Sequence, residues 1–164
     1  MQRVDIVVIG GGPAGLAASI EAARLGLDVV VLERSRETPD KACGEGLMPR
    51  GVAALRRLGA LELVDPKECA EFKGIRYLQE QTFVEGCFSN GSGLGIRRTA
   101  LVKALEARAG SLGVELKRGV RARLRECTRE RVVVEAEQHY SAGLLIAADG
   151  LNSRIRREAG LELP

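Results

Sequence analysis

Three glycines, Gly10, Gly12 and Gly15, separate an apolar segment from a helical pattern, and their spacing restricts the fold more than any other feature of the chain. In such a turn the first glycine permits a tight bend, the second lets the backbone approach a pyrophosphate, and the third lets helix and strand pack closely. The start of the helix adds free N–H groups and a partial positive charge. We therefore expect Pro13 and Ala14 to lie beside a bound phosphate as well. Taken alone, the triplet is also compatible with an ordinary glycine-rich turn.

The segments on either side of this turn complete a strand–helix–strand unit. Residues 4–9 are almost continuously apolar, residues 14–25 carry apolar side chains at helical spacing, and residues 27–32 form a second apolar run. This pattern is typical of parallel strands buried on both faces and joined by a right-handed crossover. Glu33 closes the second strand, where a carboxylate can accept hydrogen bonds from a ribose diol, and Arg34 follows it in the same expected site. The sequence thus predicts a dinucleotide site, for FAD or NAD rather than NADP, because an acidic residue disfavours a 2′-phosphate.

The remainder of the chain indicates an α/β fold. We expect a Rossmann-type parallel sheet with an antiparallel β excursion, in one domain that covers residues 1–164. After Glu33 we expect an irregular loop over 35–46, a helix over 49–58 ended by Gly59, and a hairpin over 74–88. A second helix should follow, with Thr99 as N-cap and with Leu101, Leu105 and Ala109 on one face. The last expected elements are a third parallel strand over 114–116, antiparallel strands over 120–124 and 132–136, a fourth buried parallel strand over 144–148, and a short helix reaching Arg157.

Composition argues against several other classes of function. The 164 residues are 45% hydrophobic and 29% charged, as in a soluble globular protein, with a net charge of +3 and 3% aromatic residues. A nucleic-acid surface would need a basic stripe with aromatic stacking partners, so we expect no nucleic-acid partner. We also expect no signal peptide and no membrane span, because charged Arg3 and Asp5 flank the first strand and no apolar run approaches about 20 residues.

The cysteines give no sign of a disulfide framework or of a metal site. Cys43, Cys69, Cys87 and Cys127 lack CxxC spacing, and His139 is the single histidine in the sequence. We expect reduced thiols, no bound metal and a cytoplasmic protein.

Residues 144–156 favour FAD over NAD. Their sequence, a strand followed by Asp149-Gly150 and then by a Ser-x-x-Arg helix, resembles the corresponding segment of the group A flavoprotein monooxygenases and the related geranylgeranyl reductases. The resemblance implies that Asp149 accepts a hydrogen bond from a ribityl hydroxyl of the flavin and that Gly150 permits close approach of the backbone. The alternative is a helix cap, because Asp followed by Gly is common in turns.

Three further segments match the same superfamily. Arg98, which begins an Arg-x-x-Leu-x-x-x-Leu pattern, resembles the arginine that lies near the flavin in that family; Arg97 is the competing assignment, and either could be a surface charge at a helix start. Val120 matches the position whose backbone meets the adenine. Residues 41–49 resemble the loop that geranylgeranyl reductases place over the isoalloxazine ring, which puts Gly44 in the expected site.

Within that loop, Cys43 is the one candidate for a residue close to the reacting part of the flavin. The alternative role for Cys43 is a small buried apolar residue. No other catalytic residue is assigned.

The resemblance implies the FAD-binding portion of an oxidoreductase that uses NAD(P)H as electron donor and acts on a small apolar or aromatic molecule. The reaction is hydroxylation or reduction of a carbon–carbon double bond, and the 41–49 loop slightly favours the reductase. Relatives of this kind are longer and continue into a substrate domain and a Gly-Asp turn, neither of which the sequence contains. We therefore expect an amino-terminal portion whose partner is the remaining segment or a second copy. The alternatives are a non-catalytic dinucleotide-binding module and an NAD-binding dehydrogenase domain.

Overall fold

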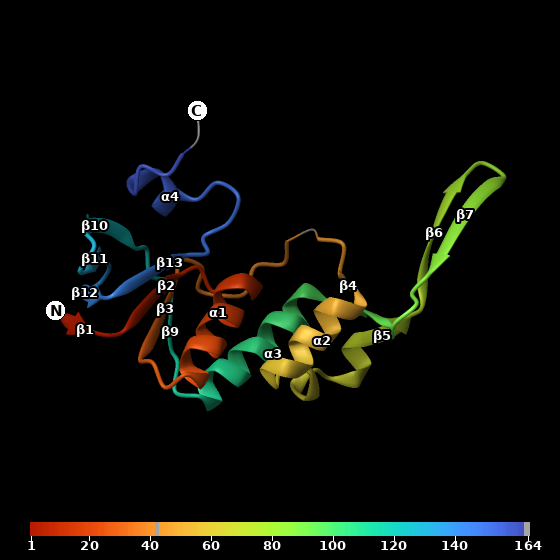
Figure 1. The fold of residues 1–164 in the computed structure, drawn as a ribbon, viewed down its shortest axis with the longest axis horizontal. Coiled ribbons are helices and arrows are strands. Elements are labelled where there is room, and N and C mark those ends of the chain that lie inside the picture. The colour runs from red at the N-terminus through yellow and green to blue at the C-terminus, as the bar shows by residue number, and fades with distance from the viewer. Residues whose placement is uncertain (42, 163–164) are drawn as a thin grey trace. The chain divides into compact units, whose positions relative to one another are not determined.

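The computed structural model describes residues 1–41 and 43–162, which form two compact units (Figure 1). The first unit combines Met1–Pro39 with Leu105–Pro164, and the second is Asp40–Ala104. Ala42, within the 41–49 loop, and the last two residues of the expected 1–164 domain lie outside the described residues.

A parallel sheet with the strand order β13-β2-β3-β9 forms the centre of the first unit. β2 is buried along its whole length and β3 is buried as far as Leu32, because both are apolar and central in the sheet. Helix α1 packs against both strands, so the strand–helix–strand unit expected from the sequence is present. The elements are β2 (Ile6–Ile9), α1 (Pro13–Arg24), β3 (Val29–Glu33), β9 (Glu115–Arg118) and β13 (Leu144–Ala147).

Strand β13 is parallel, as expected, but it is not buried. It occupies one edge of the sheet, and the side chain of Leu144 is 50% exposed. The expectation of a fourth buried strand was wrong because burial depends on neighbours at both edges, which an apolar sequence does not reveal. The exposed edge formed by β13 lines an apolar groove.

The antiparallel excursion is a second sheet of the first unit, with the order β1-β12-β11-β10. The strand expected over 132–136 is present as β11, while the one expected over 120–124 forms three residues later as β10. The sequence missed β1 and β12, and the residues of β12, His139–Ala142, are largely polar. The Tyr140 side chain of β12 is 1% exposed and packs in the core of the unit. The elements are β1 (Gln2–Arg3), β10 (Arg123–Cys127), β11 (Val132–Glu135), β12 (His139–Ala142) and a short helix α4 (Arg154–Glu158).

The second unit contains a three-stranded sheet with the order β4-β8-β5 and helix α2 beside it. Helix α2 begins at Pro49 and ends at Leu58, and Gly59 closes it with a left-handed φ of 71°, as the sequence predicted. The elements are β4 (Gly46–Leu47), α2 (Pro49–Leu58), the 3-10 turns Leu61–Leu63 and Pro66–Glu68, β5 (Cys69–Phe72), β8 (Gly93–Ile96) and α3 (Arg98–Ser111), which ends in the first unit.

Helix α3 begins two residues earlier than expected. Arg98 is its first residue, so Thr99 lies inside the helix and is not the N-cap. The Arg98 N–H donates a hydrogen bond to the Oε1 atom of Glu45, 3.1 Å away. A glutamate from a distant loop thus satisfies one of the N–H groups at the helix start that a cap residue would otherwise bind.

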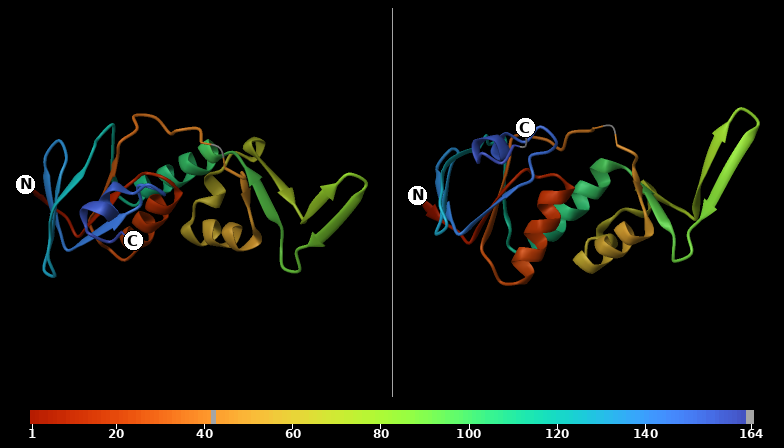
Figure 2. Two further views of the ribbon diagram at one scale, coloured as in Figure 1. Left: turned by 90° about the horizontal axis from the view of Figure 1, so that it is seen from above. Right: turned by 45° about the horizontal axis from the view of Figure 1, so that its top comes forward.

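The expected hairpin over 74–88 is formed by β6 (Gly74–Gln79) and β7 (Thr82–Cys87), which pair with each other alone among the described strands. Both views in Figure 2 show the hairpin reaching away from α2 and the small sheet of its unit. It exposes four large hydrophobic side chains, namely Tyr77, Leu78, Phe83 and Val84. Register pairs Tyr77 with Val84 and Leu78 with Phe83, so the apolar side chains occupy both faces of the hairpin.

Candidate functional site

The turn between β2 and α1 can be formed only with glycine at two of its positions. Gly10 has a φ of +110°, and a Cβ atom there would lie 2.3 Å from the carbonyl oxygen of Ala148. A Cβ atom on Gly15 would lie 2.0 Å from the carbonyl oxygen of Gly10. The first glycine therefore allows the close approach of the segment after β13, and the third allows α1 to start against the turn, as the spacing predicted.

The N-terminus of α1 has the features of an anion site. Gly12 is the N-cap, with an extended backbone (φ −81°, ψ 179°) and no side chain to bind the first N–H groups of the helix. Pro13 occupies the first turn, which carries no acidic residue, and Ala14 is exposed. The partial positive charge of the helix start is thus uncompensated and accessible, which is the environment that a pyrophosphate requires.

Glu33, at the end of β3, is the carboxylate next to this turn. Its Oε2 accepts a hydrogen bond of 2.7 Å from the Gly11 N–H, and its Oε1 accepts one of 2.8 Å from the Ser35 N–H. Half-burial raises the pKa of Glu33, but the hydrogen bonds from Ser35 and Gly11 and the positive charge of Arg118 outweigh it, so that the pKa lies below its ordinary value. The carboxylate is therefore ionised at neutral pH, and Oε2, which accepts the Gly11 N–H, can also accept a hydrogen bond from a ribose hydroxyl.

Gly11, the variable position of the glycine pattern, was not singled out in the sequence. A Cβ atom there would lie 3.0 Å from the Cβ atom of Glu33. A side chain at Gly11 would thus push the carboxylate away from the turn. The signal that could have identified it is the run of three consecutive glycines at residues 10–12, of which the pattern uses two.

Val120 lies beside the same strand end, in the connection before β10 and not at the start of an antiparallel strand as the sequence predicted. Its N–H donates a hydrogen bond of 2.9 Å to the carbonyl oxygen of Glu33, and its side chain is 4% exposed. Arg34, by contrast, is exposed. The structure brings Gly11, Glu33 and Val120 together at the carboxyl edge of the sheet, which is where ligands bind in open α/β sheets.

Arg118 is a residue of this region that sequence reasoning missed. It ends β9 and is the register partner of Glu33 on β3. One of its terminal nitrogens, Nη2, donates to the Thr38 hydroxyl at 3.0 Å and forms an ion pair with Glu106. A charged residue at the end of a short strand is common, and no motif marks this one.

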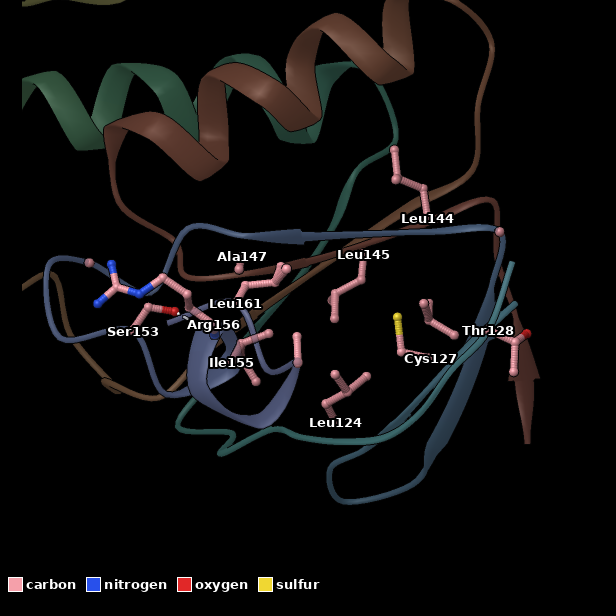
Figure 3. A pocket seen from close by; sticks show the side chains of 14 residues that line it. Leu124, Cys127, Thr128, Leu144, Leu145, Ala147, Ser153, Ile155, Arg156 and Leu161 are labelled. Atoms are coloured by element: carbon pink, nitrogen blue, oxygen red, sulfur yellow. Dashed lines mark hydrogen bonds between the residues drawn. The ribbon is translucent and has the colours of Figure 1, made fainter. Parts of the chain in front are cut away.

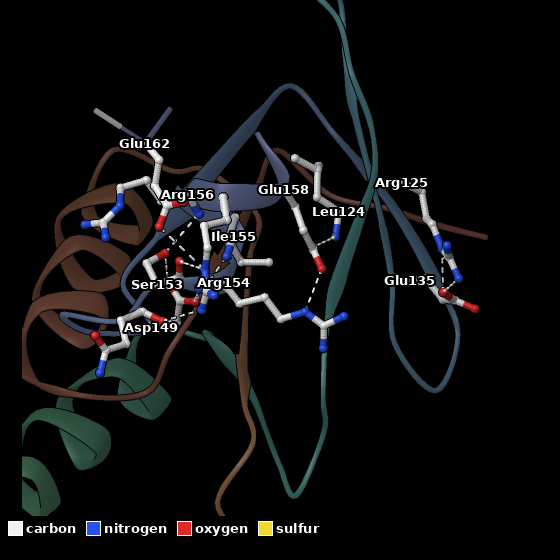
Figure 4. A network of polar contacts seen from close by, with 12 residues as sticks. Leu124, Arg125, Glu135, Asp149, Ser153, Arg154, Ile155, Arg156, Glu158 and Glu162 are labelled. Carbon is white, nitrogen blue, oxygen red and sulfur yellow. Dashed lines mark hydrogen bonds and ion pairs between the residues drawn. The ribbon is translucent and has the colours of Figure 1, made fainter. Parts of the chain in front are cut away.

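Asp149 binds the first turn of helix α4, whose N-cap residue is Ser153. Its Oδ2 accepts hydrogen bonds from the N–H groups of Arg154, at 2.8 Å, and Ile155, at 3.3 Å, and its Oδ1 accepts one from the Ser153 hydroxyl (Figure 4). The Ser153 hydroxyl in turn accepts from the Arg156 N–H at 3.0 Å. Asp149 therefore supports the helix start, which is close to the alternative that the sequence left open, although the N-cap itself is Ser153; contact of Asp149 with a flavin stays a prediction.

Gly150 follows with a φ of +98° and has no atom within 4 Å of the position of a Cβ. Its glycine is thus required by the backbone conformation rather than by crowding from the protein. The preceding residues contact the phosphate turn directly, because a Cβ on Gly10 would lie 2.9 Å from the Asp149 nitrogen. The Asp-Gly turn and the glycine turn therefore lie side by side within the first unit.

An apolar groove of about 460 Å³ runs along the exposed edge strand β13. Leu145 of β13, Leu124 of β10 and Ile155 of α4 face one another across it (Figure 3), and Gly150 and Ser153 also line it. None of the described residues that line the groove is acidic, so the groove differs in character from the polar surroundings of Glu33.

The candidates of the second unit are grouped around Glu45. Glu45 has a left-handed φ of 45°, its carbonyl oxygen accepts the Ile96 N–H at 2.7 Å, and its carboxylate accepts the Arg98 N–H. The loop with Cys43 and Gly44 is thereby tied to the start of α3. Cys43 is exposed, which does not match a small buried apolar residue, and Gly44 has open space around it. The approach of these residues to a flavin stays a prediction.

The described residues contain no group of three His, Cys, Asp or Glu side chains that could hold a metal ion, and their four cysteines are free thiols. None of the helices within residues 1–41 and 43–162 has the length and apolar character needed to cross a bilayer.

Comparison with known proteins adds a family and several relatives. The FAD binding domain family matches residues 3–164. The menaquinone reductase of Mycolicibacterium smegmatis is 34% identical over 168 residues, which cover 96% of this chain and 40% of that protein. Digeranylgeranylglycerophospholipid reductase 1 of Methanopyrus kandleri is 38% identical over 168 residues, covering 98% of this chain and 43% of that protein.

Solved structures agree on the fold. A flavoprotein/dehydrogenase from Cytophaga hutchinsonii has a TM-score of 0.87 and 26% identity, and covers 99% of this chain and 43% of its own. An anhydrotetracycline hydroxylase from Streptomyces rimosus has a TM-score of 0.87 and 27% identity, and covers 99% of this chain and 35% of its own. The chain spans about two-fifths of the length of the curated relatives described above.

Proposed function

We propose that this chain, which belongs to the FAD binding domain family of flavin oxidoreductases, binds FAD through the carboxyl edge of its parallel sheet. The observation that carries the proposal is the Glu33 carboxylate, held by the Gly11 N–H beside the open N-terminus of α1. An ionised acceptor for a ribose and an uncompensated helix start for a pyrophosphate are the two halves of a dinucleotide site.

The residues divide among the parts of FAD by their chemistry. The backbone of residues 10–15 would hold the pyrophosphate, Glu33 the adenosine ribose, and the backbone at Val120 the adenine. Asp149 and Gly150 would meet the ribityl chain. Cys43, Gly44 and Arg98 stay candidates for contact with the isoalloxazine ring, as the family resemblance implies. Bound FAD supplies the hydride and electron transfer that amino-acid side chains cannot perform.

For the complete enzyme we propose a reductase that acts on an apolar, isoprenoid-like substrate and takes its electrons from NAD(P)H in the cytoplasm. The 41–49 loop and the two relatives named as reductases of menaquinone and of a digeranylgeranyl lipid support this branch. The second candidate, hydroxylation of an aromatic substrate, is supported by the structural likeness to the anhydrotetracycline hydroxylase. In either reaction the role of these residues is to bind and orient FAD, and no general acid or base is assigned among them.

The test of FAD binding is direct. The protein is incubated with FAD or with NAD, passed through a desalting column, and its absorption spectrum is recorded. We expect the flavin bands to remain with the protein after FAD, and no retained nucleotide after NAD. A colourless protein that retains NAD would instead establish an NAD-binding dehydrogenase domain.

We further propose that this chain alone does not turn over. Catalysis requires a substrate held against the flavin with water excluded, and the chain spans about two-fifths of its relatives' length. The apolar groove along β13 is the surface on which we expect a further segment or a second copy to pack. NADPH oxidation by the chain with FAD should not exceed that of free FAD, and size-exclusion chromatography should show self-association. A monomer that oxidised NADPH catalytically would contradict the proposal.

A further inference from the structure

Arg118 and Glu33 form a matched pair at the ends of neighbouring strands. They are register partners in the parallel pairing of β3 with β9. Register partners in a sheet direct their side chains to the same face, and adjacent strands are about 4.8 Å apart. The positive charge of Arg118 also contributes to the low pKa of Glu33. A hydrogen-bond donor therefore stands next to the acceptor assigned to the adenosine ribose.

Of the two terminal nitrogens of the Arg118 guanidinium, one has hydrogen-bond partners in the protein and the other has none. Nη2 is occupied, since it donates to Thr38 and pairs with Glu106. Nη1 is buried and has no hydrogen-bond partner, and among the described residues it is the one buried side-chain nitrogen or oxygen atom in this condition. A buried N–H on a cation without an acceptor is unfavourable, and proteins seldom retain one without a reason.

We propose that Arg118 is a ribose-binding residue whose Nη1 donates a hydrogen bond to a hydroxyl of the adenosine ribose. The inference rests on the proposed function and adds a specificity residue to it. A ribose hydroxyl is both a donor and an acceptor. Glu33 can only accept and Arg118 can only donate, so the pair together satisfies both capacities of the diol. Thr38, the partner of Nη2, belongs to residues 34–41, which contain no helix or strand.

The same chemistry distinguishes a hydroxyl from a 2′-phosphate. An arginine by itself is a good partner for a phosphate. Here the ionised Glu33 carboxylate lies beside it and would repel a dianionic group. We therefore assign the pair to an unphosphorylated ribose, and the preference between the two ligands becomes an outcome of the test.

The experiment is a thermodynamic cycle between the arginine and the hydroxyl. Binding of ADP, 2′-deoxy-ADP, 3′-deoxy-ADP and adenosine 2′,5′-bisphosphate is measured by isothermal titration calorimetry for the wild type and for Arg118→Met. We expect the variant to raise the Kd for ADP about tenfold or more, the loss expected for a hydrogen bond to a charged group. For one of the deoxy analogues the same substitution should change the Kd little, because the hydroxyl is already missing.

Two further variants make the result decisive. Arg118→Lys retains the charge next to Glu106 but lacks the second nitrogen, so it should show the same loss even if Arg118→Met does not fold. Arg131→Met removes an equal charge from the exposed pair with Glu126 and should leave all four Kd values unchanged.

The outcomes separate this inference from the proposed function. A loss in Arg118→Lys that is equal for ADP and both deoxy analogues, or no loss at all, would overturn the role of Arg118. Tighter binding of adenosine 2′,5′-bisphosphate than of ADP would overturn the assignment to an unphosphorylated ribose. If Glu33→Ala, run in parallel, also retains full ADP affinity, then the dinucleotide site itself is wrongly placed.

Discussion

The two carboxylates that follow parallel strands, Glu33 after β3 and Asp149 after β13, have different tasks in the structure. Glu33 accepts one N–H from each of two loop residues and keeps lone pairs free at the edge of the glycine turn. Asp149 directs both of its oxygens to the start of α4. The difference shows that a carboxylate at a strand end is positioned by the fold, while its neighbours decide how much of it is left for a ligand.

The largest effect on FAD binding and stability is expected from a substitution at Gly10, where the glycine turn contacts the segment after β13. Gly10→Ala places a methyl group against the Ala148 carbonyl and requires a φ that alanine avoids, so both turns should be distorted. We expect loss of FAD binding together with a clearly lower Tm, measured by calorimetric titration and by circular dichroism. Gly12→Val is the matched variant, because the backbone at Gly12 is one that valine can adopt. It should abolish FAD binding with an almost unchanged Tm, and stoichiometric FAD in that variant would refute the phosphate turn.

Removing the carboxylate of Glu33 should have the next largest effect. Glu33→Ala should weaken FAD binding by about 1.5–3 kcal/mol, through the loss of charge-assisted hydrogen bonds. Glu33→Gln should cost less, but not nothing, since its amide nitrogen must face either the Gly11 or the Ser35 N–H. Fluorescence titration with FAD checks both variants. Unchanged affinity in Glu33→Ala would show that Glu33 does not bind the ribose and that the dinucleotide site is wrongly placed.

Substitution of Asp149 should lower both the stability of the protein and its affinity for FAD. Asp149→Ala removes the acceptor of the Arg154 and Ile155 N–H groups while the N-cap Ser153 stays, and should lower the free energy of unfolding by about 1 kcal/mol. Asp149→Asn retains one acceptor for the helix and should cost less stability. If Asp149 also meets the flavin, both variants weaken FAD binding, and Ala does so more. If Asp149→Asn changes neither the stability in urea unfolding nor the affinity in FAD titration, then Asp149 serves only the start of the helix.

The smallest expected effect is the pH dependence that Glu33 contributes to stability. Its pKa is lower in the folded protein than the ordinary 4.5, so the ionised form is stabilised by folding. The contribution is complete above the ordinary pKa and is lost as the pH falls through the folded pKa. The difference in unfolding free energy between the wild type and Glu33→Gln, measured by urea titration, should therefore be constant above about pH 5 and shrink below it. A difference that grows on acidification would contradict the environment described for Glu33.

The sequence predicted the first unit well where local chemistry decides the structure. The apolar strands, the glycine turn and the position of Glu33 follow from residues 4–33 alone, because each step is a local preference. The edge position of β13 and the existence of β12 were harder to predict. The residues of β12 are largely polar, and its Tyr140 side chain is buried only by tertiary packing. The hydrogen bonds of Glu45 and the pairing of Arg118 with Glu33 join residues far apart in the chain, and no pattern in one sequence reveals them.

The central claim is that the carboxyl edge of the sheet binds FAD through its adenosine diphosphate half. Calorimetric titration of the wild-type protein with FAD, repeated in the presence of excess ADP, tests it most directly. We predict one FAD bound per chain, with ADP competing for the same site, because residues 10–15 and Glu33 would serve both ligands. Failure of ADP to compete with bound FAD, or tighter binding of NAD than of FAD, would contradict the claim.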